Sequence, residues 1–157
     1  MTHPGFHAHD HSHCMSDAMS AAVSYCENNG LRFTPVRKRV FEILLNEHKS
    51  MGAYDILEIL AKEGLGSQPP VVYRALEFLR THGFIHKIER LNAFVACGQP
   101  GTGHTPAFMI CRGCTTVVEM DSKPGVGLAS AAEDMGFVIE AMVVEAEGLC
   151  PACRTAA

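Results

Sequence analysis

The chain has 157 residues, of which 47% are hydrophobic and 19% are charged, a composition that suits one or two small globular domains and excludes an intrinsically disordered protein. It has no apolar run of about 18 residues and no N-terminal basic segment followed by an apolar one, so we expect neither a membrane span nor a secretory signal, but a cytoplasmic protein. In that reducing compartment the seven cysteines are expected to be metal ligands or free thiols and not disulfides.

The formal net charge of −4 argues mildly against nucleic acid as a partner, but the charge is unevenly distributed. Residues 31–90 hold ten Lys or Arg against seven Asp or Glu, whereas residues 91–157 hold three against seven. The basic part of the chain could therefore face phosphates, although such a small excess also suits an ordinary solvated surface.

Histidines crowd the first 14 residues, MTHPGFHAHDHSHC. This composition predicts a flexible tail over residues 1–14 that binds divalent metal loosely, with a defined extra metal site as the alternative. The residues concerned are His3, His7, His9, Asp10, His11, His13 and Cys14.

Four helices are expected in the next part of the chain. The first is capped by Ser16 and closed by Gly30, with Cys26 on its apolar face as a packed thiol. Thr34-Pro35 starts the second, the third covers about 53–62, and Pro69-Pro70 opens the fourth, which runs to about His82.

The fourth helix carries apolar residues at helical spacing, Val72, Leu76 and Leu79, which are expected to face the core. Its other face then presents aromatic and basic side chains, a pattern that fits the recognition helix of a helix-turn-helix in the major groove of DNA. An ordinary amphipathic helix with solvated charges is the alternative. The candidate basic contacts to phosphates or bases are Arg37, Arg39, Arg74 and Arg80.

A β-hairpin is predicted next, from residues 84–90 and 93–97 around a loop of Leu91-Asn92. A two-residue loop places His86 directly opposite Cys97, about 5 Å apart on one face, where they could share a metal ion. Alternatively Cys97 is a small core residue and His86 a surface residue. A slip of one residue would separate the two, and Leu-Asn is a weak turn pair.

Residues 98–106, GQPGTGHTP, are predicted to form a hinge that contains His104. Strands over 107–110 and 115–121 are expected around Cys111-Arg-Gly-Cys114, with Glu119 on the second strand. A helix is predicted over 124–135, then a long β-rich run over 137–147 that leads to Cys150-Pro-Ala-Cys153, and a frayed end.

Two CxxC pairs supply four thiolates, the full complement of a closed tetrahedral zinc site, so Cys111, Cys114, Cys150 and Cys153 are predicted to hold a structural zinc ion. Redox-active CxxC pairs or free thiols are the alternative, but redox pairs usually open a helix of a thioredoxin-like βαβ unit, and neither pair here is expected to open a helix. A second set of mixed N, S and O ligands suits tetrahedral zinc and disfavours manganese or magnesium. That set is His86, Cys97, His104 and Glu119; the alternative is that His104 and Glu119 are solvated surface groups.

Several motifs in this order resemble the ferric uptake regulator (Fur) family, and within it the zinc uptake regulators. The resemblance covers nearly all of the chain after the histidine tail. It rests on LRFTPVR at 31–37, GAYDILEIL at 52–60, PPVVYRALEFLRTHGFIHKIE at 69–89, NAFVAC at 92–97, CRGC at 111–114 and CPAC at 150–153.

The resemblance implies an α+β fold, in which an N-terminal winged helix-turn-helix domain precedes a small α/β dimerisation domain with a structural four-cysteine zinc site. It implies that His86, Cys97, His104 and Glu119 bind a sensory zinc ion, and that Tyr73 and Arg74 meet DNA. The expected domains are a tail at 1–14, a winged helix at 15–97, a hinge at 98–106 and a dimerisation domain at 107–157.

The sequence therefore predicts a homodimeric, zinc-responsive repressor of zinc uptake genes that binds a palindromic DNA operator and two zinc ions per chain. A regulator that responds to iron, manganese or peroxide is the nearest alternative. A zinc buffer or delivery protein and a thiol-redox enzyme are alternatives of other classes. An enzyme is not expected, because the sequence shows no catalytic triad, no phosphate-binding loop and no open metal position.

Overall fold

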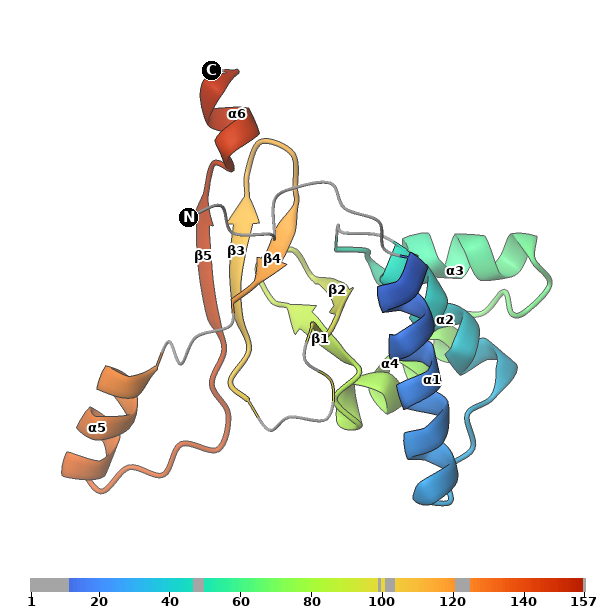
Figure 1. The fold of residues 1–157 in the computed structure, drawn as a ribbon, viewed down its shortest axis with the longest axis horizontal. Coiled ribbons are helices and arrows are strands. Elements are labelled where there is room, and N and C mark those ends of the chain that lie inside the picture. Colours follow the sequence, from blue (N-terminus) through green and yellow to red (C-terminus); the bar gives the residue numbers. More distant parts are fainter. Residues whose placement is uncertain (1–11, 47–49, 99, 101–103, 121–124, 157) are drawn as a thin grey trace. The chain divides into compact units, whose positions relative to one another are not determined.

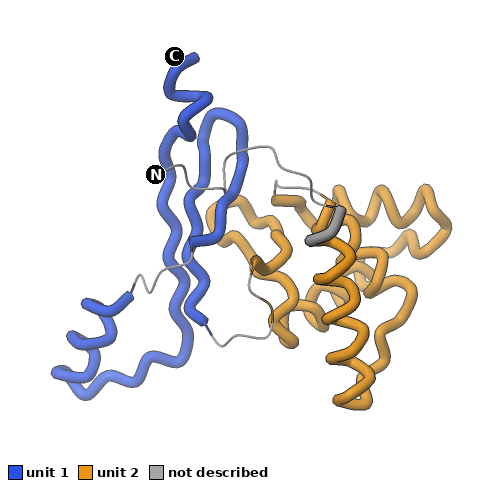
Figure 2. The backbone as a smooth tube through the Cα atoms, in the orientation of Figure 1, with its two compact units in different colours: residues 1–6, 102–157 blue, residues 7–101 orange. Residues whose placement is uncertain are grey.

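The computed structural model describes residues 12–46, 50–98, 100, 104–120 and 125–156 (Figure 1). The side chains of residues 12–14 are not described, so the metal-binding role predicted for the tail falls outside the described part of the chain. The chain divides into two compact units between Gly101 and Thr102, within the stretch predicted as a hinge. The N-terminal one, coloured orange and labelled unit 2 in Figure 2, is called the first unit below, and the C-terminal one, coloured blue and labelled unit 1, is called the second unit. Among the described helices, none is both long and apolar enough to cross a membrane.

The first unit consists of a helical bundle and a hairpin. Its elements are α1 (Ser12–Asn28), α2 (Pro35–Asn46), α3 (Ala53–Lys62), α4 (Pro69–Thr81), β1 (Ile85–Ile88) and β2 (Ala93–Ala96). Thr34 caps α2, since its Oγ1 accepts the Arg37 N–H at 3.3 Å. Two prolines stand in the first turn of α4, where no helical N–H partner is required.

The core of this unit is built by one apolar stripe from each helix. Val72, Leu76 and Leu79 of α4 are almost completely buried, as their spacing predicted. Cys26 of α1 is 1% exposed, which confirms that it is a packed thiol, and burial raises the pKa of that thiol.

The hairpin has a different register from the predicted one. His86 pairs with Val95 and Ile88 with Ala93, so the loop is four residues long instead of two. The shift moves the register by two positions, and therefore leaves His86 and Cys97 on the same face of the ribbon. Asn92 ends the loop with a φ of 45°, a left-handed conformation that asparagine tolerates well.

A short extended segment between α2 and α3 adds to this hairpin. Met51 and Phe94 exchange two backbone hydrogen bonds, of 2.9 and 2.8 Å, in an isolated antiparallel bridge. Together with α2, α3 and α4, this arrangement is the predicted winged helix-turn-helix, and the Met51 bridge is a part that the sequence pattern did not indicate.

The second unit is built on a three-stranded sheet in the order β4-β3-β5. Its elements are β3 (Ala107–Cys111), β4 (Val117–Glu119), α5 (Val126–Asp134), β5 (Val144–Gly148) and α6 (Pro151–Thr155). The central strand β3 runs antiparallel to β4 and parallel to β5. Figure 1 shows α5 beyond one end of this sheet and α6 at the other end, where β5 finishes.

Two expectations for this unit were wrong. The strand predicted over 137–147 is confined to β5, because residues 137–143 lie outside the sheet and connect α5 to β5. Of the last four residues, which were expected to fray, Arg154 and Thr155 belong to helix α6, and the second CxxC pair therefore begins a short helix, which was not expected. Pro151 occupies its first turn, and the Cys150 side chain accepts a hydrogen bond from the Cys153 N–H.

Candidate metal centres and nucleic-acid interface

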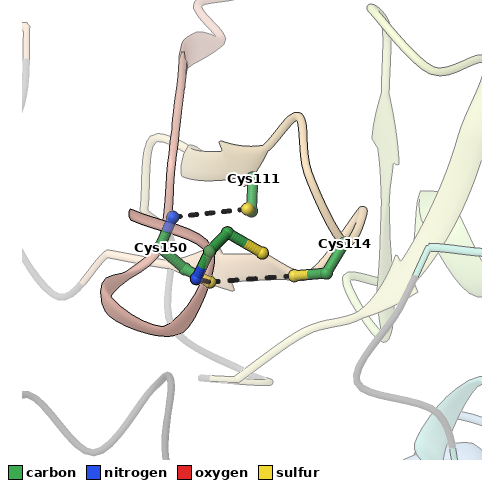
Figure 3. A group of neighbouring side chains, drawn as sticks. Cys111, Cys114 and Cys150 are labelled. Carbon is green, nitrogen blue, oxygen red and sulfur yellow. Dashed lines mark hydrogen bonds between the residues drawn. The ribbon is translucent and has the colours of Figure 1, made fainter. Parts of the chain in front are cut away.

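Four cysteines converge at one end of the second unit. The sulfur atoms of Cys111, Cys114, Cys150 and Cys153 all lie within 4.8 Å of one another. Figure 3 shows the labelled side chains turned toward a common point. The Cys114 and Cys150 sulfurs are 3.8 Å apart, which matches the sulfur–sulfur edge of about 3.8 Å that a tetrahedron with zinc–sulfur bonds of about 2.3 Å requires. The donor set therefore fits a closed zinc site.

The strand register explains why two CxxC turns 39 residues apart meet. Cys111 lies beside Gly148 in the parallel β3–β5 pair, so both strands end together and both turns start at the same edge. The Cys150 N–H then donates to the Cys111 sulfur at 3.3 Å (Figure 3). Such backbone donors orient the ligands and stabilise thiolate charge.

Gly113 lies where the two turns pack closely against each other. A Cβ at this position would lie 3.0 Å from the Cys153 sulfur and 3.1 Å from its Cβ. The following Thr115 has a φ of 60°, a costly conformation for a β-branched residue, and its N–H bonds to the Cys111 carbonyl at 2.8 Å. The tight turn thus places the sulfurs at the expense of local strain.

The thiols of this cluster differ in how readily they lose a proton. Hydrogen bonds from the backbone, chiefly from the Cys150 N–H, lower the pKa of Cys111 to about 6. The hydroxyl of Thr116 lowers the pKa of Cys114. The neighbouring Cys150 thiol, followed by Cys111, raises the pKa of Cys153 to about 12. Four thiolates this close repel one another, and a divalent cation relieves that repulsion.

The hairpin of the first unit supplies one pair of further ligand atoms. A ring nitrogen of His86, on β1, and the sulfur of Cys97, directly after β2, lie within 4.8 Å of each other. The Cys97 N–H is held by the Phe84 carbonyl at 2.9 Å, which fixes the end of the ribbon. The predicted pairing of His86 opposite Cys97 was wrong in register, but the diagonal arrangement still brings the two side chains together.

The second unit supplies another pair. His104, just before β3, and Glu119, at the end of β4, approach to 2.6 Å between Nε2 and Oε1. Their side chains are only 21% and 12% exposed. They are therefore not the well-solvated surface groups of the alternative reading. Each unit by itself thus holds two of the four predicted sensory ligands.

Helix α4 presents the aromatic and basic face that the sequence predicted. Tyr73 is 46% exposed, and Arg74 and Arg80 are also exposed. None of these side chains belongs to the buried stripe of the helix, so all three are available to a partner on that face. This is the surface that a recognition helix needs.

The other two candidate arginines already have partners inside the first unit. Arg39 binds both carboxylate oxygens of Glu63, at 2.7 and 2.8 Å, and also contacts Glu42 at 3.1 Å. Arg37 lies over the Phe78 ring, with its guanidinium carbon 3.7 Å from the ring centre. Arg39 therefore uses three of its five N–H donors on carboxylates of its own unit, which makes it a weaker candidate for a phosphate contact than the exposed arginines of α4.

Comparison with known proteins identifies the family to which this chain is similar. The model of the ferric uptake regulator family matches residues 28–146. The zinc uptake regulation protein of Escherichia coli K12 is 37% identical over 142 residues, which cover 87% of this chain and 81% of that protein.

Solved structures agree with the sequence comparison. A structure described as a zinc uptake regulator complexed with zinc and DNA matches 90% of this chain and 96% of its own, with a TM-score of 0.85 and 35% identity. The crystal structure of holo XcZur matches 87% and 96%, with a TM-score of 0.79 and 37% identity. With the winged helix, the sheet of the second unit and the four-cysteine cluster in place, the chain belongs to the ferric uptake regulator family.

Proposed function

We propose that this protein is a zinc-responsive, DNA-binding transcriptional repressor of zinc uptake genes, which acts as a homodimer in the cytoplasm. One observation carries the proposal: the chain resembles, over 90% of its length and at 35% identity, a zinc uptake regulator that was solved with zinc and DNA. Two sets of soft or mixed ligands in the chain support the same metal. No catalytic activity is part of this proposal.

The four-cysteine cluster is proposed to hold one zinc ion for structure. Bound there, zinc crosslinks the end of β3 to the start of α6 and neutralises the thiolates. Cys111 and Cys114 come from the turn after β3, and Cys150 and Cys153 from the turn after β5, so the filled site would tie these two turns together at one edge of the sheet. Its binding energy would thereby become folding energy.

The remaining four ligands are proposed to form the sensory site. His86 and Cys97 offer one nitrogen and one sulfur, and His104 and Glu119 offer one nitrogen and one oxygen. Neither pair alone fills the four positions of tetrahedral zinc, whereas the two pairs together do. Since one pair belongs to each unit, a shared ion would link the winged helix to the second unit, for a total of two zinc ions per chain.

The second unit is proposed to pair with a second copy of itself. It exposes an unusually apolar surface on α5 and the segment after it, where Leu128 is 60%, Met135 81% and Phe137 66% exposed. These residues line a groove of about 310 Å³. Contiguous apolar surface of this kind marks interaction sites. A two-fold dimer would present two α4 helices, which explains why a palindromic operator is expected.

In this dimer, Tyr73 and Arg74 of α4 are proposed to read bases, and Arg80 to contact phosphate. An arginine can bind guanine with two hydrogen bonds in the major groove. The sensory ligands would act on this contact indirectly, by limiting how the winged helix moves relative to the dimer. Linkage then requires DNA to tighten zinc binding by the same factor by which zinc tightens DNA binding.

A metal competition assay tests the proposed function. Duplexes are selected from a random pool in separate selections with the protein loaded with zinc, iron(II) or manganese(II). The selected duplexes are labelled, and binding is measured by fluorescence anisotropy at buffered free concentrations of each metal. Tight sequence-specific binding with zinc alone is expected. Binding with iron or manganese but not with zinc would assign the protein to the other metal regulators, and no specific binding at any zinc level would favour a zinc buffer.

A further inference from the structure

The N-terminal turn of α2 is attached to α4 by a stack of aromatic and cationic side chains. The Arg37 guanidinium covers the Phe78 ring at 3.7 Å, and the ring of Phe33 lies on Phe78 at 6.5 Å with an interplanar angle of 27°. Lys38 lies 5.7 Å from the centre of the Phe33 ring. The stack therefore joins the segment before α2, the first turn of α2 and the second half of α4.

Arg37 is held in this position from two further sides. Its backbone N–H binds the capping Thr34, which fixes the first turn of the helix. Its guanidinium also donates to the Arg32 carbonyl. A guanidinium that lies over a ring and also donates to a carbonyl has little freedom to reach out to a phosphate.

Phe78 is the residue of α4 that contacts this stack. It lies outside the fully buried stripe of the helix but packs against the core cluster as a partly buried residue. It follows Arg74 by four residues and therefore lies one turn below it on the same face of the helix. A ring fixed at Phe78 resists rotation of α4 about its axis, and this rotation decides where Tyr73 and Arg74 point.

We propose that Arg37 is a positioning residue for DNA recognition, which acts through Phe78 to set the direction of the α4 side chains and does not itself contact DNA. This inference rests on the proposed function, and replaces direct contact as the expected role of Arg37. It assigns sequence specificity in part to a residue outside the recognition helix.

Binding measurements on the zinc-loaded, full-length protein separate this role from a phosphate contact. Arg37→Met is expected to weaken binding to the selected duplex roughly tenfold. Affinity for a scrambled duplex and the salt dependence should not change, because no phosphate partner is lost. Arg80→Met, the control variant in α4 itself, should weaken binding to both duplexes and lower the salt slope by about 0.9.

A double-mutant cycle tests whether the effect passes through the ring. Phe78→Leu should lower specific affinity, and Arg37→Met should add little in its presence. Additive effects, or a lower salt slope for Arg37→Met, would overturn the proposal in favour of direct contact. If Arg37 had a purely structural role, Arg37→Met would lower the folded fraction and weaken binding to both duplexes equally. The ratio of the affinities for the selected and the scrambled duplex would then stay unchanged.

Hydrogen exchange without DNA keeps this test independent of the proposed function. Arg37→Met is expected to speed amide exchange in Val72–Thr81 at least threefold, whereas Arg80→Met should leave it unchanged. If the wild type binds no DNA but this exchange effect appears, the proposed function fails and the link from Arg37 to α4 stands. If α4 exchange does not respond to Arg37→Met, the positioning role is rejected whatever the DNA assay gives.

Discussion

Cys97 and Cys111 are both nearly buried thiols, at 7% and 2% exposure, yet their surroundings assign them different tasks. Cys111 lies among three other cysteines and receives a backbone hydrogen bond from Cys150. Cys97 has one nearby ligand partner in its own unit, His86. A complete set of ligands within one unit favours a structural ion, whereas a half set leaves room for a response to the metal.

Replacement of single cysteines tests this division. Cys111→Ser should abolish folding or dimerisation of the second unit, because it removes a ligand from a site whose binding energy is folding energy. Cys97→Ser should leave a folded dimer with one zinc ion fewer. Circular dichroism, sedimentation and zinc content measure both. Unfolding by Cys97→Ser together with a folded Cys111→Ser protein would mean that the two sites are reversed.

The pKa of Cys111 predicts how pH affects the structural zinc. Metal binding requires thiolates, so protons compete and zinc affinity falls as pH falls. Above pH 6 the Cys111 thiol has already lost its proton, because its pKa is lowered to about 6. Below pH 6 one more proton competes, so a plot of log affinity against pH should steepen by about one. Chelator competition from pH 7.5 to 5 that gives one constant slope would contradict this.

At the scale of elements, the position of the four sulfurs depends on the close approach of two turns. Gly113→Ala should push the Cys153 turn away and weaken zinc binding at this site roughly tenfold, since the added methyl group would lie 3.0 Å from sulfur. Gly148→Ala, at the end of β5, is the matched control, because its methyl group would meet no heavy atom within 4 Å. Equal zinc affinity in both variants would show that the turns can adjust.

Local sequence signals predicted most elements of the first unit, but they did not predict the register of the hairpin. Capping residues, prolines and apolar stripes fix α2, α3 and α4, so the positions of these helices could be read directly. The start of α1 was predicted wrongly: the helix begins at Ser12, inside the predicted tail, and not after a cap at Ser16. The hairpin loop was placed two residues too short, because Asn92 adopts a positive φ at the end of a longer turn and not inside a two-residue one. The prediction that His86 and Cys97 lie on the same face was still correct, because the predicted register differs from the observed one by an even number of residues.

The second unit was harder to predict, because a run of apolar and β-branched residues can form an exposed interaction surface as well as a β-strand. Residues 137–143 are rich in apolar residues, but Phe137 and Val138 are exposed and lie outside the sheet. In the proposed dimer, the second copy of the chain would bury this segment. By contrast, α6 had a readable signal in Cys150-Pro151, a cap followed by a proline in the first turn.

At the scale of the whole molecule, repression requires two copies of the chain. Phe137→Glu should convert the dimer to a monomer, because it places a charge in the middle of the apolar surface of the second unit. Tyr54→Glu is the control: Tyr54 is an aromatic residue of α3 that is 69% exposed, and this variant should stay dimeric. Sedimentation of the zinc-loaded proteins without DNA measures the oligomeric state of both variants. A dimeric Phe137→Glu protein would place the interface elsewhere.

The central claim is that one labile zinc ion shares ligands from both units and thereby controls DNA binding. Its most direct test is operator affinity against buffered free zinc for the wild type, Cys97→Ser in the first unit and Glu119→Gln in the second. The account predicts that zinc strengthens wild-type binding at least a hundredfold, and that both variants lose this response while they keep the four-cysteine zinc and the dimer. A full zinc response in either variant would contradict the account.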